Sequence, residues 1–365
     1  MWTYHLVDTL SGEKLHQVKP AGGGTWGRMI SDQGGGSHSF PLSASPLTKA
    51  QWKDGTQHWA RTLVVSWNGV AKYAGLILHR QYDRKKKTLQ VRHKDMRIIL
   101  GRRFPFGVDE YDRTLVLENK NQSLQGLAAG AVRRALTKEG NPRWTLPVIV
   151  PGPSAGSESR TYYAYEFTTA ESMLDEVEGL DGGPDVDFEP RWSPTTGRLE
   201  WVMRIGSPRL AESPSYEFAM NVDRPGLFDL SDEEDGSQML TGLLAIGKGS
   251  EQDIRIGKGG AGIDGGPLVP FLDSSQSFKE LDDIAVLNSH AQGEVRARRY
   301  ATKQWSASVR TDSIDVAALR LGATFRLRFS GDEWEDDGAT DFYLIAYYGD
   351  GTQTLTLDLQ DPRRI

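Results

Sequence analysis

The chain has 365 residues, enough for two or three domains, and its 25% charged and 38% apolar residues are typical of a folded protein. The absence of cysteine excludes disulfides, thiolate metal sites and cysteine nucleophiles. A net charge of −6 argues against sequence-independent DNA binding, which needs a basic surface. The sequence has no apolar run of about 18 residues that would predict a transmembrane helix, and we expect no secretory signal at its start.

Residues 1–118 are predicted to be mostly β-strand. Asn68-Gly69 lies between two β-prone runs, and this residue pair favours a type I′ hairpin turn. The basic run RKKK at residues 84–87 separates two further strands. We expect this run to be the solvated tip of a hairpin, because basic runs alone often match nucleic-acid sites by chance.

Residues 119–228 are predicted to form an α+β domain with two helices. The first spans about 123–142, with Leu124, Leu127 and Ala131 on one face. The second spans about 168–179, with Thr168 and Glu171 as a predicted capping box. Two strands, 184–192 and 198–206, follow around a turn at 193–197.

Residues 229–365 are predicted to be β-rich with one long helix. We expect the helix to begin at a capping box of Ser277 and Glu280 and to continue to about 303. Its acidic start and basic end are what the helix dipole favours. Its expected apolar stripe is Leu281, Ile284, Ala291 and Val295. Strands are predicted at 324–329, 342–348 and 352–359.

The stretch LDGGPDVDFEP contains the pattern closest to a catalytic motif. Asp185, Asp187 and Glu189 match the last three acids of the chitinase-type glycosidase signature, DGxDxDxE or DGxxDxDxE. However, Asp181 is one residue out of step with the commoner spacing, and Pro190 replaces the aromatic residue that follows the glutamate. The eight strand–helix units of that fold are also missing. We expect Val186 and Phe188 to face a core, so that the three acids point to solvent.

Other motif matches lack the context that their chemistry requires. GPSAG at 152–156 would present Ser154 as a nucleophile with His290 as a distant base, but no helix is predicted behind it. GLLAIGK at 242–248 lacks the hydroxyl after Lys248, and GKGGAG at 257–262 precedes no helix. The acidic stretches SDEEDG and DEWEDDG resemble calcium-binding loops but lack the glutamate that closes such a loop. The sequence therefore predicts no catalytic, cofactor-binding or metal-binding residues.

Four stretches, taken together, carry a family resemblance. The first is the W-x-G hairpin (Trp67, Gly69), with the strand around Leu76 and the return strand that ends at Asp95. The others are GGPDVDF with TGRLEWVMRIGSP, the strand MLTGLLAIGKG, and the helix with an L-x-x-H-A element (Leu287, His290 and Ala291). Together they resemble the baseplate hub or minor tail proteins of long-tailed phages (siphoviruses) that infect actinobacteria.

The resemblance implies a mainly β fold with α+β insertions: tail-tube-like β-barrel domains and a helix-and-hairpin α+β domain. It implies a non-enzymatic homotrimer at the virion tail tip, made in the bacterial cytoplasm. Its partners would be the distal tail protein, the tape-measure protein and central tip or fibre proteins. Genomic DNA would only pass through the lumen, and no membrane insertion is expected. The alternatives are a cell-wall or chitin-type glycoside hydrolase that uses Glu189, and a carbohydrate-binding module suggested by ten tryptophans.

Overall fold

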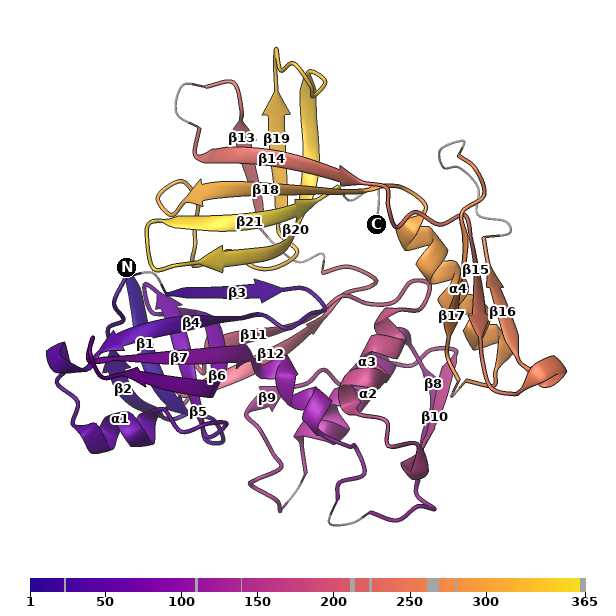
Figure 1. Cartoon of the computed structure of the whole chain (residues 1–365), viewed down its shortest axis with the longest axis horizontal. Helices are drawn as coiled ribbons and strands as arrows, with labels where there is room; N and C mark the ends of the chain where they lie inside the picture. The colour runs from indigo at the N-terminus through magenta and orange to yellow at the C-terminus, as the bar shows by residue number, and fades with distance from the viewer. Residues whose placement is uncertain are drawn as a thin grey trace.

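The structure, a computed structural model, describes residues 1–361 apart from 23, 109–110, 139, 211–213, 223–224, 261–268 and 280. The N-terminal strands form an antiparallel array in the order β3-β4-β7-β6-β5-β1-β2 (Figure 1). These strands are β1 (Trp2–Asp8), β2 (Lys14–Val18), β3 (Thr25–Met29), β4 (Gly35–Pro41), β5 (Arg61–Trp67), β6 (Val70–Asp83) and β7 (Thr88–Asp95). Helix α1 (Lys49–Gly55) and the 3₁₀ turns η1 (Leu42–Ala44) and η2 (Met96–Arg102) connect or follow them.

The C-terminal strands continue the same sheet. They are β13 (Ser215–Ala219), β14 (Leu227–Asp235), β18 (Thr302–Arg310), β19 (Thr324–Phe329), β20 (Gly338–Gly349) and β21 (Thr354–Gln360). Strand β20 pairs with β3 between Ala346–Met29 and Gly349–Trp26, which joins the two groups of strands. One hydrophobic core fills the space between them and includes Trp26. The two groups are therefore stabilised both by backbone pairing and by a shared core.

The middle of the chain packs on the other face of the N-terminal strands. It contains β8 (Val116–Gln122), α2 (Leu124–Leu136), β9 (Val148–Ile149), β10 (Glu158–Tyr163), η3 (Ala164–Glu166), α3 (Ala170–Glu178), β11 (Val186–Trp192) and β12 (Leu199–Ile205). In β5, Leu63 and Val65 belong to the core shared with the C-terminal strands, whereas Val64 packs with α2, α3 and β11. The continuous apolar run LVV is thus explained by burial of both faces of the sheet.

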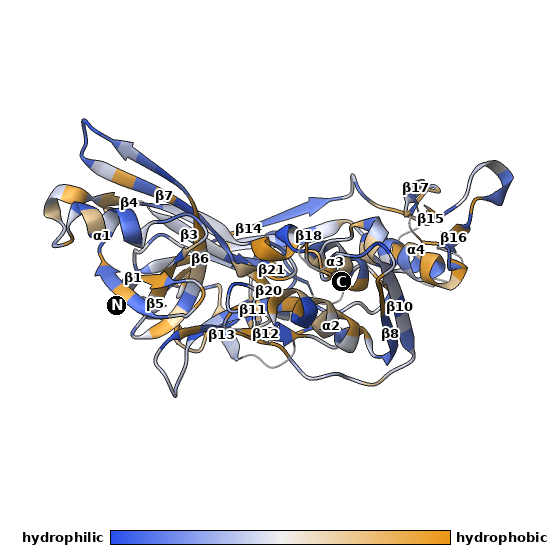
Figure 2. Cartoon of the chain, turned by 90° about the horizontal axis from the view of Figure 1, so that it is seen from below, coloured by the Kyte–Doolittle hydropathy of each residue, from blue (hydrophilic) through white to orange (hydrophobic). Residues whose placement is uncertain are grey.

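A small unit lies at the right of Figure 1. It comprises β15 (Gly242–Ile246), η4 (Glu251–Asp253), β16 (Ile256–Gly259), β17 (Asp273–Ser277) and α4 (Ile284–Arg298). A Cβ atom on Gly257 or Gly259 would lie only 2.4 or 2.1 Å from backbone atoms of α4, so glycine is required for the strand and helix to approach this closely. Helix α4 carries both hydrophobic and hydrophilic residues (Figure 2), and its buried residues are Leu287, His290, Ala291 and Val295.

The structure confirms the mainly β fold with helical insertions. Asn68 and Gly69 have φ values of 47° and 85°, as a type I′ turn requires. The basic run at 84–87 is exposed between β6 and β7, as predicted. The first predicted helix corresponds to α2, although α2 ends at Leu136, before the expected stop.

Two predicted helix starts are wrong. Helix α3 is capped by Thr169, whose side chain accepts from the backbone N–H of Ser172, and Glu171 binds an arginine instead of closing a capping box. Ser277 lies in β17, opposite Ile246 of β15, because the parallel pairing holds this segment extended. The second partner of that capping box, residue 280, lies outside the described residues.

Helix α4 therefore begins later than expected, at Ile284, with Asp283 as its N-cap. Ile284 is 44% exposed, so its predicted place in the apolar stripe is also wrong. Leu281 precedes the helix and is partly buried against its core. Ala291 and Val295 are buried as predicted.

Candidate functional site

The three acids of the glycosidase-like motif lie at the junction between the two groups of strands. The prediction that they point to solvent is wrong: Asp187 is only 4% exposed, and Asp185 and Glu189 are partly buried. The reason lies in the tertiary packing around β11. Strand β11 packs beside β6, and the C-terminal part of the chain covers the face that a two-stranded hairpin would leave to water.

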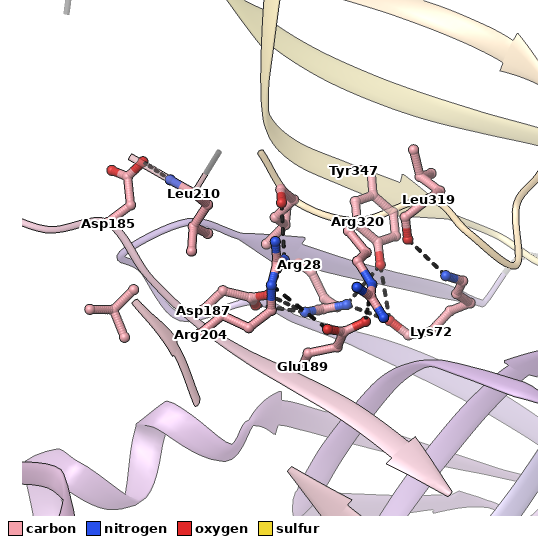
Figure 3. A network of polar contacts seen from close by, with 12 residues as sticks. Arg28, Lys72, Asp185, Asp187, Glu189, Arg204, Leu210, Leu319, Arg320 and Tyr347 are labelled. Carbon is pink, nitrogen blue, oxygen red and sulfur yellow. Dashed lines mark hydrogen bonds and ion pairs between the residues drawn. The ribbon is translucent and has the colours of Figure 1, made fainter. Parts of the chain in front are cut away.

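Asp187 is bound by two arginines (Figure 3). Arg28 from β3 donates through Nη2 to both carboxylate oxygens, at 2.6 and 2.8 Å. Arg204 from β12 donates through Nη1 to Oδ2 at 3.2 Å. Charge-assisted bonds of this kind are about twice as strong as neutral ones, and here they connect three strands.

Arg28 extends the network towards the C-terminal strands. Its Nη1 donates to the hydroxyl of Tyr347 in β20 at 2.9 Å, and this hydroxyl donates to the carbonyl of Lys72 at 3.3 Å. Burial raises the pKa of Tyr347. Burial, and then the charge of Arg28, lower the pKa of Lys72 to about 7. Lys72 Nζ donates to the carbonyls of Ala317 and Leu319, at 2.9 and 2.8 Å.

The remaining two acids also have partners in distant segments. Glu189 forms ion pairs with Arg320 at 2.9 Å and with Arg204 at 3.8 Å. Asp185 accepts from the hydroxyl of Tyr343 at 2.7 Å, and burial raises the pKa of this carboxyl group. Glu189 in β11 and Asp185 just before it therefore contact the C-terminal part of the chain directly, whereas Asp187 is linked to it only through Arg28 and Tyr347.

We call the set of Arg28, Lys72, Asp187, Glu189, Arg204, Arg320 and Tyr347 the polar junction. The cavity beside Asp187 has a volume of about 10 Å³, which is about the space that one water molecule needs. A sugar ring does not fit there. The geometry suits a clamp between segments, because removing one member of a buried ion pair leaves an uncompensated charge.

A second buried charge cluster lies next to the polar junction and was not predicted. Arg97 in η2 is 2% exposed, and α3 supplies three acids to it. The distances are 2.9 Å to Glu171, 2.9 Å to Asp175 and 2.7 Å to Glu178. The spacing of these acids along one helix face was visible in the sequence, but their shared partner lies more than seventy positions away.

The other motif residues do not form a catalytic arrangement. Ser154 precedes strand β10, not a helix, so the nucleophile elbow is absent at this described segment. His290 stacks on Phe278 with ring centroids 4.6 Å apart, and burial lowers its pKa to about 4. Residues 242–246 form β15 as predicted, and part of the GKGGAG motif lies outside the described residues. The described residues contain no group of three or more acidic or histidine side chains placed to hold a metal ion.

The basic end of α4 is engaged within the chain. Arg296 donates to both carboxylate oxygens of Asp181, at 2.6 and 2.7 Å. Arg298 donates to the backbone carbonyl and side chain of Gln238 and forms an ion pair with Glu294. These contacts fix α4 against the loop after α3 and against the segment before β15. Within the described residues, no helix is both long and apolar enough to span a membrane.

Comparisons with known proteins give a consistent structural result. No protein-family model matches the chain, and no curated protein matches it by sequence. Among solved structures, the 43 kDa tail protein of prophage MuSo2 from Shewanella oneidensis is similar, with a TM-score of 0.58 and 10% identity over 99% of this chain and 98% of that one.

Two further solved structures are similar over at least 95% of their length. The tail protein from Neisseria meningitidis has a TM-score of 0.52 and 12% identity, covering 100% of this chain and 97% of that one. Prophage tail protein gp18 from Listeria monocytogenes has a TM-score of 0.51 and 8% identity, covering 100% and 95%. From the first strand to the last, this chain has the fold of phage tail proteins.

Proposed function

We propose that this chain is a structural component of a phage tail tip, a homotrimeric baseplate hub. It connects the tail tube and distal tail protein to the central tip or fibre proteins, and it contacts the end of the tape-measure protein. The hub is made in the cytoplasm of the host, which we place among the actinobacteria, and is then built into the virion. Its division into domains at residues 1–118, 119–228 and 229–365 is part of this proposal.

The observation that carries the proposal is the extent of the fold similarity. Three tail proteins of different origin share this fold over at least 95% of both chains, so the likeness is not confined to one part of the chain. Fold similarity alone does not fix a function, because one fold hosts many. It supports this one because the acids of the glycosidase-like motif are already engaged: Asp187 and Glu189 belong to the polar junction, and Asp185 accepts a hydrogen bond from Tyr343.

The charge balance supports a role for the hub in lining the DNA channel. The net charge is −6, and the basic residues at the end of α4 contact groups of the chain itself. An acidic wall repels phosphates, whereas a basic wall would retain passing DNA through counterion release. We therefore expect negligible DNA affinity at physiological salt, and we expect neutralisation of Arg296, Arg298 and Arg299 to leave it unchanged.

Particle images and protein copy number test the proposal. Quantitative mass spectrometry of purified virions is expected to give three copies of this chain per particle, and images of the tail tip are expected to show a three-fold ring that contains it. Absence from the virion would refute the tail-tip role. A two-fold or four-fold ring would refute the trimeric hub. A monomer in isolated solution does not decide between these outcomes, so the assembled particle is the object to measure.

A further inference from the structure

The loop between β19 and β20, residues 331–337, presents an exposed tryptophan on an ordered backbone; we call it the tryptophan loop. Trp334 is 78% exposed. The Asp332 carboxylate accepts from the backbone N–H groups of Trp334 and Glu335 at 2.9 and 2.8 Å, and Asp337 accepts from that of Gly331 at 2.6 Å. An exposed, preorganised aromatic residue is a common anchor of protein interfaces, because little entropy is lost when it binds.

The tryptophan loop is also strongly acidic. Its sequence GDEWEDD places Trp334 among five carboxylates. Of these, Glu335 forms an ion pair with Lys303 at 2.9 Å, whereas Glu333 and Asp336 are exposed. A partner that buries Trp334 must therefore combine an apolar pocket with positive charge, since burying these carboxylates without cations would be costly.

The chain itself has a groove with these two properties. The groove has a volume of about 550 Å³ and lies along α2. Its lining includes three cationic residues (Arg133, Arg134 and Lys138) against one acid, Glu118, and the aromatic residues Trp144 and Phe106, of which Phe106 is only 9% exposed. This volume is in the range of ordinary ligand sites, about 300–1,000 Å³. We call it the cationic groove.

We propose that the tryptophan loop of one copy docks into the cationic groove of a neighbouring copy, with the Trp334 indole against Trp144 and the loop carboxylates beside Arg134 and Lys138. The contact joins different copies, because the β19–β20 end and α2 lie on opposite sides of the chain (Figure 1). It is a head-to-tail contact between unlike surfaces, the type that generates closed rings. The inference rests on the proposed homo-oligomer and identifies its contact surfaces.

Site-specific crosslinking in assembled particles tests the contact directly. A photoreactive benzoylphenylalanine replaces Trp334, and mass spectrometry locates the crosslinked peptides after irradiation. We expect crosslinks to peptides that contain Phe106 or Trp144, in a species of twice the chain mass. The same probe at Tyr82, an exposed aromatic residue on the β6–β7 hairpin, is the control and is expected to miss the groove.

Charge reversal and rescue test the chemistry of the contact. The double variant Arg134→Glu, Lys138→Glu is expected to bind neighbouring copies at least about 30-fold more weakly in an assembly titration with the tail partners. This is the size of effect that the loss of one interface anchor typically has. Glu333→Lys with Asp336→Lys is expected to have a similar effect. Combining the four substitutions is expected to restore assembly, which a folding defect in either double variant would not do.

The outcomes separate this inference from the proposed function. If the chain is absent from virions, the tail-tip proposal fails, and this inference fails with it. If the chain is present as a ring but crosslinks from position 334 reach another tail protein or another surface, only the inference is overturned. Unchanged assembly of the two charge-reversed variants would also overturn it.

Discussion

Replacement of Asp187 by asparagine tests the role of the polar junction as a clamp. The substitution keeps the size of the side chain but removes a charge that accepts two bonds from Arg28 and one from Arg204. Both guanidinium groups would remain largely buried with less compensation. Breaking a buried ion pair in this way costs about 3–5 kcal/mol, a large part of the 5–15 kcal/mol that typically stabilises a domain.

Urea unfolding at neutral pH, followed by tryptophan fluorescence, measures this cost. The matched control is Glu200→Gln in β12, which removes a 2.6 Å ion pair with Arg191, a side chain that is about half exposed. We expect the control to cost at most about 1 kcal/mol. If Asp187→Asn costs no more than the control, the clamp reasoning is wrong. A compensating buried water or a relaxed junction would then be the better description.

Three other changes have defined expected results. The wild-type protein is expected to release no reducing sugar from chitin or host cell wall, so Glu189→Gln should have no activity to remove. Wild-type activity that disappears in the variant would contradict the proposed structural role. Leu287→Ala, in the core under α4, is expected to cost about 2–5 kcal/mol in urea unfolding, whereas Ile284→Ala, at an exposed position, should change stability by about 0.5 kcal/mol or less. Burial lowers the pKa of His38 to about 4, so the unfolded state binds this proton more tightly between about pH 6.5 and 4, and the contribution of His38 to stability should fall by about 3 kcal/mol as pH drops through this window. The His38→Gln variant should lose part of this pH dependence, and an identical pH profile would contradict the assignment.

Local patterns in the sequence located several of the helices and strands. Asn68-Gly69 specifies its turn through two positive φ angles, which few other residue pairs adopt easily. Alternation of apolar residues located β11 and β12, and the apolar stripe of α2 located that helix. These features depend on neighbouring residues, so short-range chemistry is sufficient to find them.

The environment of the motif acids was decided only by the tertiary structure. Alternation correctly separates the two faces of β11, but it cannot say whether the second face meets water or another part of the chain. Here it meets Arg28 and Arg320, which lie more than 100 positions away in the sequence. Likewise, Ser277 begins a plausible helix by local preference, yet pairing with Ile246 holds it in a strand. The sequence by itself therefore determined where strands, turns and helix caps can form, because these depend on neighbouring residues. Long-range packing determined which charged side chains are buried, because burial depends on which other part of the chain covers a surface.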